Sequence, residues 1–177
     1  VHLFVYGDGV KLASTIHPLK GGGTVSNCLA TSPQLTHENL KKAILLGQNT
    51  RDDTGKPMPF FNGAFYIVAN PSLADRIFEI LNTGNVPYTA NYIANVFQGA
   101  GGVGVTTPYI SSTTQWTLVD GMASPIVQVI FKHVTAEDWF DENVKAYVYD
   151  VSAEWKVGAI DFRGIVHSVG DNSVITD

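Results

Sequence analysis

At 177 residues, the chain is long enough to form one domain and to bury about two-thirds of its unfolded surface. Hydrophobic residues make up 45% of it and charged residues only 15%, against about 25% charged in a typical soluble domain. We therefore expect other chains to cover part of the surface. The net charge of −5, without a run of Lys or Arg, argues against direct nucleic-acid binding, which needs a basic stripe to neutralise phosphates.

Cysteine content and hydropathy further limit the class of protein to which the chain can belong. The single Cys28 excludes an internal disulfide and a cysteine-based zinc site, and favours a cytosolic origin. No apolar stretch approaches the ~18 residues of a membrane span, and no charged-then-apolar leader opens the chain. The sequence begins at Val1 in a strand-like run with no preceding cap, so we expect that an upstream segment is missing.

The first third of the chain combines a long loop, a helix and a turn. Residues 13–33 are rich in Gly and small polar side chains, which predicts a loop longer than compact domains usually contain. Thr36 is a good N-cap, and the apolar spacing after it predicts a helix over His37–Gln48, with Gly47 near its end. Charged and turn-forming residues at 50–59 predict an exposed turn.

A strand followed by a helix is predicted next. The apolar run at 64–69 has strand length and indicates a strand buried on both faces. Asn70 suits a helix cap and Pro71 a first helical position, and an apolar stripe of Leu73, Ile77, Ile80 and Leu81 predicts a helix that ends at Gly84. A weaker helix is predicted over 89–97, broken by the glycines that follow.

The last third of the chain is predicted to be strands. Turn residues and the acidic stretch 137–142 separate four strand-like runs, at 114–120, 126–133, 144–151 and 155–167. Helices early and antiparallel strands late give an α+β fold.

The glycine-rich segment Gly99–Gly104 satisfies the pattern G-x-G-x-x-G of dinucleotide-binding folds, and Asp120 lies at a plausible spacing for a ribose contact. That chemistry needs a strand before the glycines and a helix after them, so that the helix N-terminus can hold a pyrophosphate. Here a helix-like stretch precedes the glycines, and Pro108 with β-branched neighbours disfavours a helix start. A flexible glycine loop is the preferred interpretation.

Other candidate sites are weaker. Asp52 and Asp53, even with Asp8 or His37, lack metal-ligand spacing and indicate a solvated turn. Cys28 has no base adjacent in sequence, so a Cys–His hydrolase would need one of two distant histidines, His17 or His37, to approach it. The three Trp residues do not share one face of any element, which favours core or interface positions. We assign no catalytic, cofactor-binding or metal-binding residue.

The segment Ser14–Asn27 (STIHPLKGGGTVSN), followed by Leu29–Thr31 (LAT), resembles the major head subunit family of Mu-like phages and prophages. The order of elements after it is similar to the wider tailed-phage major capsid protein fold. That order comprises a helix, a DTGKP turn at 53–57, a strand and helix around YIVANP at 66–71, a glycine-rich middle, and aromatic strands such as WKVGAIDFRG at 155–164.

The resemblance implies a peripheral region formed by residues 1–86 and 125–177 and an axial region formed by residues 87–124. Gly99, Gly101, Gly102 and Gly104 would then belong to a subunit-contact loop near the symmetry axes, where permissive backbone angles would let it differ between pentamers and hexamers. In this family an N-terminal arm, an extended loop and most of a long spine helix precede the His-Pro stretch. The chain has no room for them before Ser14, so we expect a truncated subunit that lacks all three.

The function implied is structural. The protein would be a major capsid subunit that self-assembles through pentamers and hexamers into an icosahedral shell, made in the cytoplasm of a bacterial host and resident in the virion. It would enclose phage double-stranded DNA without sequence-specific binding, with scaffold, maturation protease, portal and decoration proteins as further partners and no membrane contact. Two alternatives stay open. One is a cytosolic α+β enzyme that binds a phosphate-bearing ligand at Gly99–Gly104, and the other is a bacterial encapsulating shell protein of the same fold.

Overall fold

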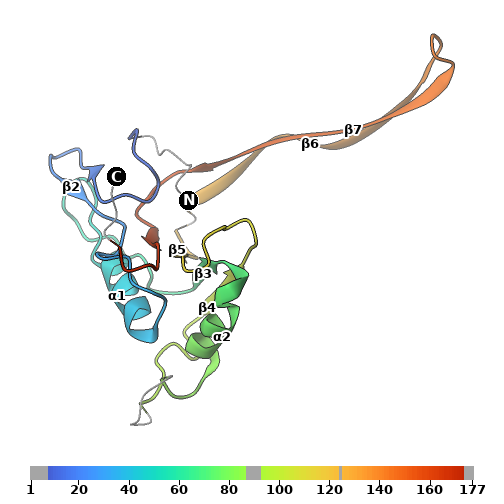
Figure 1. Ribbon diagram of the computed structural model, residues 1–177. Helices are drawn as coiled ribbons and strands as arrows, with labels where there is room; N and C mark the ends of the chain where they lie inside the picture. Colours follow the sequence, from blue (N-terminus) through green and yellow to red (C-terminus); the bar gives the residue numbers. More distant parts are fainter. Residues whose placement is uncertain (1–7, 87–92, 124, 174–177) are drawn as a thin grey trace.

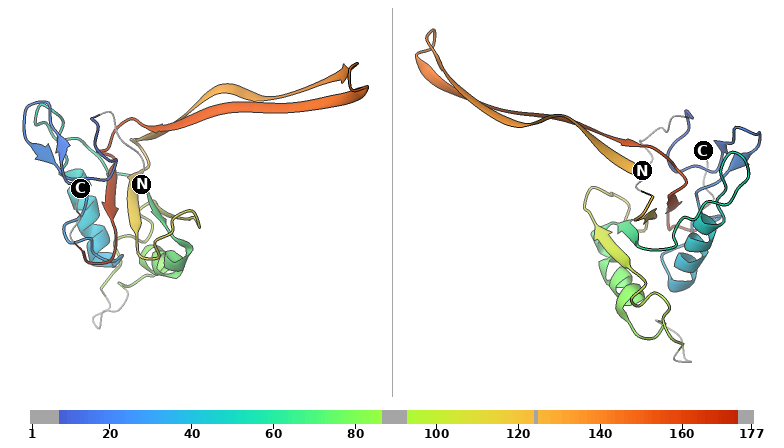
Figure 2. Two further views of the ribbon diagram at one scale, coloured as in Figure 1. Left: turned by 45° about the horizontal axis from the view of Figure 1, so that its top comes forward. Right: turned by 180° about the vertical axis from the view of Figure 1, so that it is seen from behind.

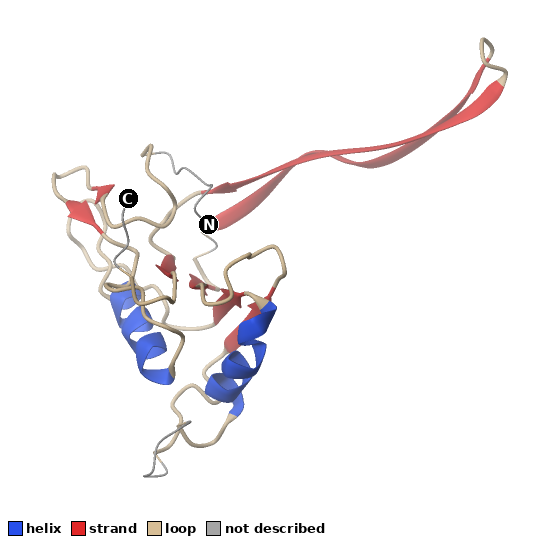
Figure 3. Cartoon of the chain, viewed as in Figure 1, coloured by secondary structure: helices blue, strands red, loops and turns tan. Residues whose placement is uncertain are grey.

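The computed structural model describes residues 8–86, 93–123 and 125–173 and has a mixed α+β architecture (Figure 1). A body contains one four-stranded sheet and two helices, and a long two-stranded hairpin projects from it. Figure 3 shows that long loops make up much of the remaining body. None of the helices in the described part of the chain is long and apolar enough to cross a membrane.

The sheet has the strand order β4-β3-β5-β8. These strands span Gly102–Thr106 (β4), Phe65–Ala69 (β3), Trp116–Asp120 (β5) and Ile165–Ser168 (β8). β3 and β4 are parallel, and the other two pairs are antiparallel. The strands β4 and β5 thus share one sheet with β3 and β8, although the predicted axial region contains the first two and not the others. The division into peripheral and axial regions stays a prediction.

The two strongest helix predictions are confirmed. The helix α1 spans His37–Gln48, and the side chain of its N-cap Thr36 accepts a hydrogen bond from the Asn39 amide (3.2 Å). A short 3₁₀ turn, η1 (Pro71–Leu73), leads into α2 (Ala74–Asn82). The Asn70 side chain caps the start of η1, where the sequence predicted a cap. The predicted 50–59 turn is also present, closed by a bridge between Arg51 and Pro57.

Gly47 lies inside α1 and does not end it, because the C-cap is Asn49. A side-chain carbon at Gly47 would collide with the Phe61 ring. The glycine therefore allows the aromatic ring to pack directly on the helix backbone.

Both helices pack on the same face of the sheet. That face carries Phe65, Ile67 and Ala69 of β3 together with their partners Leu118 and Trp116 of β5. On that face, α1 lies against the β8 half and α2 against the β4 half, and Figure 1 shows the two helices next to these two halves. The core formed here includes Leu40 and Ala43 of α1 and Ile77, Ile80 and Leu81 of α2.

Only the first part of the predicted glycine loop Gly99–Gly104 lies outside a strand. Gly102 and Gly104 belong to β4, on the face that α2 covers. A side-chain carbon at Gly102 would lie 2.6 Å from the Phe65 ring, and one at Gly104 would lie 2.5 Å from Ile77. These two glycines let the helix approach the strand closely. Of these four glycines, Gly99 and Gly101 have the positive φ angles (77° and 78°) that favour glycine in a turn.

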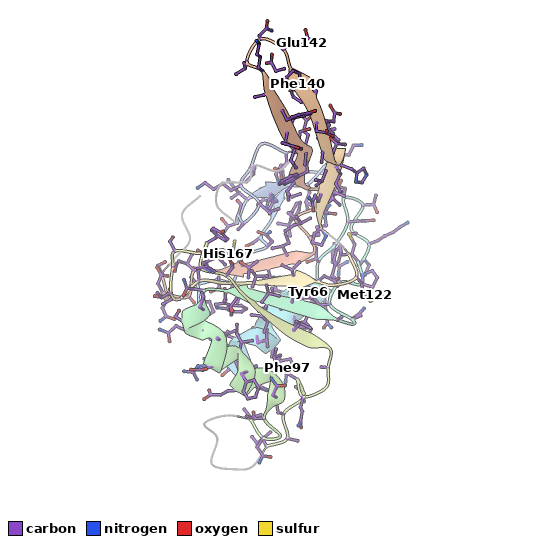
Figure 4. All side chains as sticks on the ribbon, turned by 90° about the vertical axis from the view of Figure 1, so that its right-hand side faces the viewer. Tyr66, Phe97, Met122, Phe140, Glu142 and His167 are labelled. Atoms are coloured by element: carbon purple, nitrogen blue, oxygen red, sulfur yellow. The ribbon has the colours of Figure 1, made fainter. Side chains whose placement is uncertain are left out.

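The opposite face of the sheet is covered over one half only. Over the β5–β8 half, Leu12 of the N-terminal segment packs against Ile165 of β8. The same segment carries the small hairpin β1 (His17–Pro18) and β2 (Thr24–Val25), and then pairs with β8 through a parallel bridge between Cys28 and His167. Over the β3–β4 half the face is open and Tyr66 is 40% exposed. Figure 4 shows Tyr66 there beside Met122. The prediction that β3 is buried on both faces is therefore wrong.

The buried side chain of Asn27 holds the N-terminal segment in place. Its amide nitrogen donates to the carbonyl oxygens of Leu12 (2.7 Å) and Phe162 (3.3 Å), and its oxygen accepts from the Ser14 amide (2.9 Å). His17 adds a ring stacked on Phe162 at 3.8 Å. The segment that carried the family resemblance thus has a structural role in this chain.

Two further predictions need correction. The weak helix at 89–97 is wrong over residues 93–97, which form an isolated bridge and a turn; residues 89–92 lie outside the described part. The predicted strands at 126–133, 144–151 and 155–167 have the wrong limits. Residues 126–141 form one strand, β6, and residues 146–159 form its partner, β7. The acidic stretch that was predicted to separate strands lies mostly inside β6.

The close approach of α2 to β4 gives a test. Gly104→Ala should lower the free energy of unfolding by about 1–3 kcal/mol, because the added methyl group overpacks against Ile77. Urea denaturation would measure the change. Gly158→Ala in β7 is the matched control, since a methyl group there would meet no atom within 4 Å. Equal midpoints for the two variants would contradict the packing described.

Candidate assembly surface

The hairpin formed by β6 (Ile126–Asp141) and β7 (Ala146–Ala159), here called the arm, is a two-stranded sheet of its own. Fourteen residues of β7 at about 3.3 Å per residue give a length of about 45 Å. All views in Figures 1 and 2 show it extending away from the body. The extended loop that we expected to be lacking is one that would precede Ser14, and for the present segment the sequence predicted only separate strands. The arm shows that a projection exists later in the chain.

The arm is anchored only at its base. Ala159 packs against a small apolar cluster of Leu12, Phe162 and Ile165. The amide of Ile160 donates to the Pro125 carbonyl (2.8 Å), closing the two chains where they enter the body. Beyond this point, β6 and β7 pair with each other and with no other named strand.

Large apolar side chains cover both faces of the arm and are exposed to solvent. Residues paired across the ladder lie on the same face, so Phe140, Tyr147 and Tyr149 share one face while Trp139 and Val148 lie on the other. Phe131, Tyr149 and Trp155 are 64%, 76% and 58% exposed. The Phe140 and Tyr147 rings contact each other edge to face at 5.2 Å, but neither is buried.

Such a ribbon has no core of its own. An isolated two-stranded hairpin is at best marginally stable in water, and contiguous exposed apolar surface on a soluble chain marks a site of interaction. The arm therefore has the properties of a surface that another molecule covers.

Charge is concentrated at the end of the arm. We define the arm tip as residues 137–150, around the labelled Phe140 and Glu142 in Figure 4. It contains five acidic residues (Glu137, Asp138, Asp141, Glu142 and Asp150) and one basic residue, Lys145. The tip thus carries −4 of the chain's net charge of −5, which leaves the rest of the molecule almost neutral.

The body carries an apolar cleft beside α1. It has a volume of about 810 Å³ and lies between the helix and the segment Ser26–Thr31, with Leu29, Leu45 and Leu46 among its lining. Leu45 is 56% exposed there. Thr31 and Ser32 at its edge have positive φ angles (59° and 39°), an uncommon conformation for residues other than glycine.

Comparison with known proteins decides the family. A family model described as "Phage capsid protein" matches residues 5–168. The chain belongs to this phage capsid protein family. A solved structure described as a virus-like particle from Pyrococcus furiosus is also similar, with a TM-score of 0.46 and 14% sequence identity over 80% of this chain and 55% of that one. The capsid chain thus spans about half the length of that structure's chain. No curated protein matches.

Membership of the phage capsid protein family indicates a structural role for the chain and supports the expectation that it is not an enzyme. The alternative of a phosphate-binding enzyme also fails on geometry. Gly99 and Gly101 lie in the turn before β4, and Gly102 and Gly104 lie in β4 itself. No helix begins directly after these glycines, so no helix N-terminus is present to hold a phosphate. Asp120, the candidate ribose contact, is buried and accepts hydrogen bonds from the amides of Phe61 and Met122.

The other candidates of the capsid chain lie apart or serve the fold. Among the residues that the structure describes, no group of three or more His, Cys, Asp or Glu side chains could hold a metal ion. Asp52 accepts hydrogen bonds from its own turn, chiefly from the Thr54 side chain, which lowers the pKa of its carboxyl. His37 bonds to the Asn95 side chain (3.2 Å). Cys28 is a buried thiol beside Asn27.

The residues most relevant to a capsid function were not selected from the sequence. Trp139 and Trp155 were assigned only in general terms to a core or an interface, whereas Trp116 is fully buried and donates to the Pro33 carbonyl (3.0 Å). The signal available was the mixture of acidic and aromatic residues at 137–150, where acidic and aromatic pairs follow one another. It fits a strand on which neither face is buried.

The exposure of the arm predicts that its aromatic residues add little to the stability of the isolated subunit. Replacing Phe140 and Tyr147 together by Ser should change the free energy of unfolding by less than about 1 kcal/mol. Trp116→Ala in the sheet should cost about 3–5 kcal/mol. Denaturation monitored by circular dichroism would compare them. A large loss in the arm variant would show that the arm packs on its own body.

Proposed function

We propose that this chain is the coat-forming part of a tailed-phage major capsid subunit, of the Mu-like type, whose copies build an icosahedral shell around double-stranded DNA. The observation that carries the proposal is the arm, which exposes apolar residues on both faces over about 45 Å. A neighbouring subunit would supply the surface that covers it. The family match over residues 5–168 supports the same conclusion.

The charge distribution is compatible with enclosed DNA. With a net charge of −5 and no basic run, the chain lacks the phosphate-neutralising stripe that DNA binding requires. The DNA would be contained by the shell and not bound by sequence. Scaffold, maturation protease, portal and decoration proteins remain further partners in the proposal.

The turn around Gly99 and Gly101 is the proposed contact near the symmetry axes. Both glycines are exposed and have positive φ angles, so the turn can vary in shape between pentamers and hexamers. Gly102 and Gly104 are not part of this contact in the revised proposal, because they pack against Phe65, Leu81 and Ile77.

The first experiment is electron microscopy of the complete gene product that contains this chain, expressed alone or with a candidate scaffold. We expect closed shells or rings. In a second sample, residues 131–154 are replaced by Asn-Gly, which can close a hairpin between the paired residues Ile130 and Trp155. Because the intersubunit contact is removed while the body is untouched, assembly should be lost and the body should unfold at the same urea concentration.

The matched control is Lys56→Ala, a change in an exposed loop of the body, which should assemble normally. Shells formed without the arm would contradict its role, and a monomeric complete product would contradict assembly altogether. The cargo distinguishes the remaining alternative, since an encapsulating shell would contain protein in place of DNA.

A further inference from the structure

We propose that the arm tip of one subunit docks into the apolar cleft beside α1 of a second copy of the chain. This inference rests on the proposed function and specifies the two surfaces that meet. The tip is residues 137–150, and the cleft is the one between α1 and Ser26–Thr31.

The arm cannot reach the cleft of its own subunit. It leaves the body at Pro125 and Ile160 and extends away from it, whereas α1 lies on the other side of the body (Figures 1 and 2). An occupant with this chemistry must therefore come from another molecule, and a second copy supplies it in the same orientation every time.

Shape and apolar surface match. The cleft of about 810 Å³ has a largely apolar lining that includes Leu29, Leu45 and Leu46. The tip presents Trp139 on one face and Phe140 with Tyr147 on the other, all exposed. Buried aromatic anchors in apolar pockets are the usual centres of binding energy at interfaces.

Charge matches as well. Lys42 is the one charged residue lining the cleft, and Lys41 lies beside Leu45 at a spacing of i, i+4 on the same helix surface. Lys42 bonds to Glu38 (2.7 Å), but both side chains are exposed, so the pair is weak and can be exchanged for a carboxylate of the tip. Two ammonium groups against one carboxylate on α1 complement a tip of net charge −4.

A second cleft on the body fits the tip less well. It is lined by Lys20 and Arg163 but also by Asp8 and Asp53, and Arg163 already pairs with Asp53 (2.6 Å) and Asp161 (3.3 Å). The acidic tip would meet carboxylates there. The cleft beside α1 has no acidic residue in its lining.

Because the tip and the cleft are different patches of one chain, the contact is head to tail. Such a contact closes into rings or continues into open arrays, whereas a reciprocal exchange of two tips would close as a two-fold dimer. A head-to-tail contact suits a shell, and it allows the tip and the cleft to be altered separately in an experiment.

The test uses charge reversal in the complete gene product. Lys41→Glu with Lys42→Glu forms the cleft variant, and Asp141→Lys with Glu142→Lys forms the tip variant. Each should raise the concentration needed for assembly by roughly tenfold or more, because the cleft variant brings like charges together in the interface and the tip variant removes the net charge that attracts the tip to the cleft. A chain carrying all four changes should recover assembly. Lys20→Glu with Lys56→Glu changes the net charge equally at exposed body loops and should assemble as the unaltered chain does.

Mixing the two defective variants gives the decisive result. Reversal brings the net charge of the tip from −4 to zero in the tip variant, which keeps a native cleft, and leaves a negative cleft in the cleft variant, which keeps a native tip. A one-to-one mixture should therefore regain assembly, because the native tip meets the native cleft and the reversed tip meets the reversed cleft, while each variant alone stays unassembled at the same concentration. Unchanged urea midpoints would establish that all variants fold.

Two results would overturn the docking. If the cleft variant assembles normally while replacement of residues 131–154 prevents assembly, the arm is needed but docks elsewhere. If the fourfold variant fails to recover assembly and the mixture of the two variants stays unassembled, the tip and cleft are not partners. If assembly survives replacement of the arm, it is the proposed role of the arm that fails.

Discussion

A two-stranded ribbon can bury side chains only against something outside itself, and most of this molecule's features depend on that constraint. In the body, a sheet with helices on one face can bury Ile67, Leu118 and Trp116 completely. In the arm, each strand has one neighbour and two open faces, so Phe131, Tyr149 and Trp155 remain exposed. The described residues thus bury a core in the body and leave an apolar extension that they do not cover.

The body is built to hold the arm at a defined angle. Ala159 at the base of the arm joins the cluster of Leu12, Phe162 and Ile165, and Asn27 ties Leu12 to Phe162 through two hydrogen bonds. The same N-terminal segment continues into Cys28 and Leu29, which form one wall of the cleft beside α1. The base of the arm and the wall of the cleft are therefore positioned by one segment, so a displacement of this segment would alter both surfaces at once.

The sequence predicted those features that depend on interactions between residues close together in the chain. Thr36 at the start of α1 and Asn70 before α2 cap their helices as predicted, because capping depends on residues within one turn. The glycines at 102 and 104 were misinterpreted because their role depends on a helix packing across a strand, with Ile77 more than twenty residues away. A glycine needed for close approach and a glycine needed for a turn have the same sequence pattern.

The arm was missed for a different reason. A strand is recognised by alternating buried and exposed residues, and β6 places acidic and aromatic residues side by side at 137–141 without a buried face. The acidic stretch therefore indicated a boundary between strands. The four-residue turn 142–145, with Lys145 at a φ of 51°, follows no strong hairpin signal such as Asn-Gly. In such a strand the residues suit an assembled state in which both faces are covered. The hydrophobic pattern of the single chain therefore does not identify the strand.

Segregation of charge resolves the difficulty that an exposed apolar arm creates. Apolar surface on both faces invites nonspecific association between arms, and like charges at the tips oppose it. With −4 on each tip, two arms repel each other at the end where they would first meet, while a cleft flanked by Lys41 and Lys42 attracts the tip. The same carboxylates that disfavour contact between tips favour contact between tip and cleft. The charges thus select a head-to-tail arrangement, and the aromatic residues supply its affinity once the register is set.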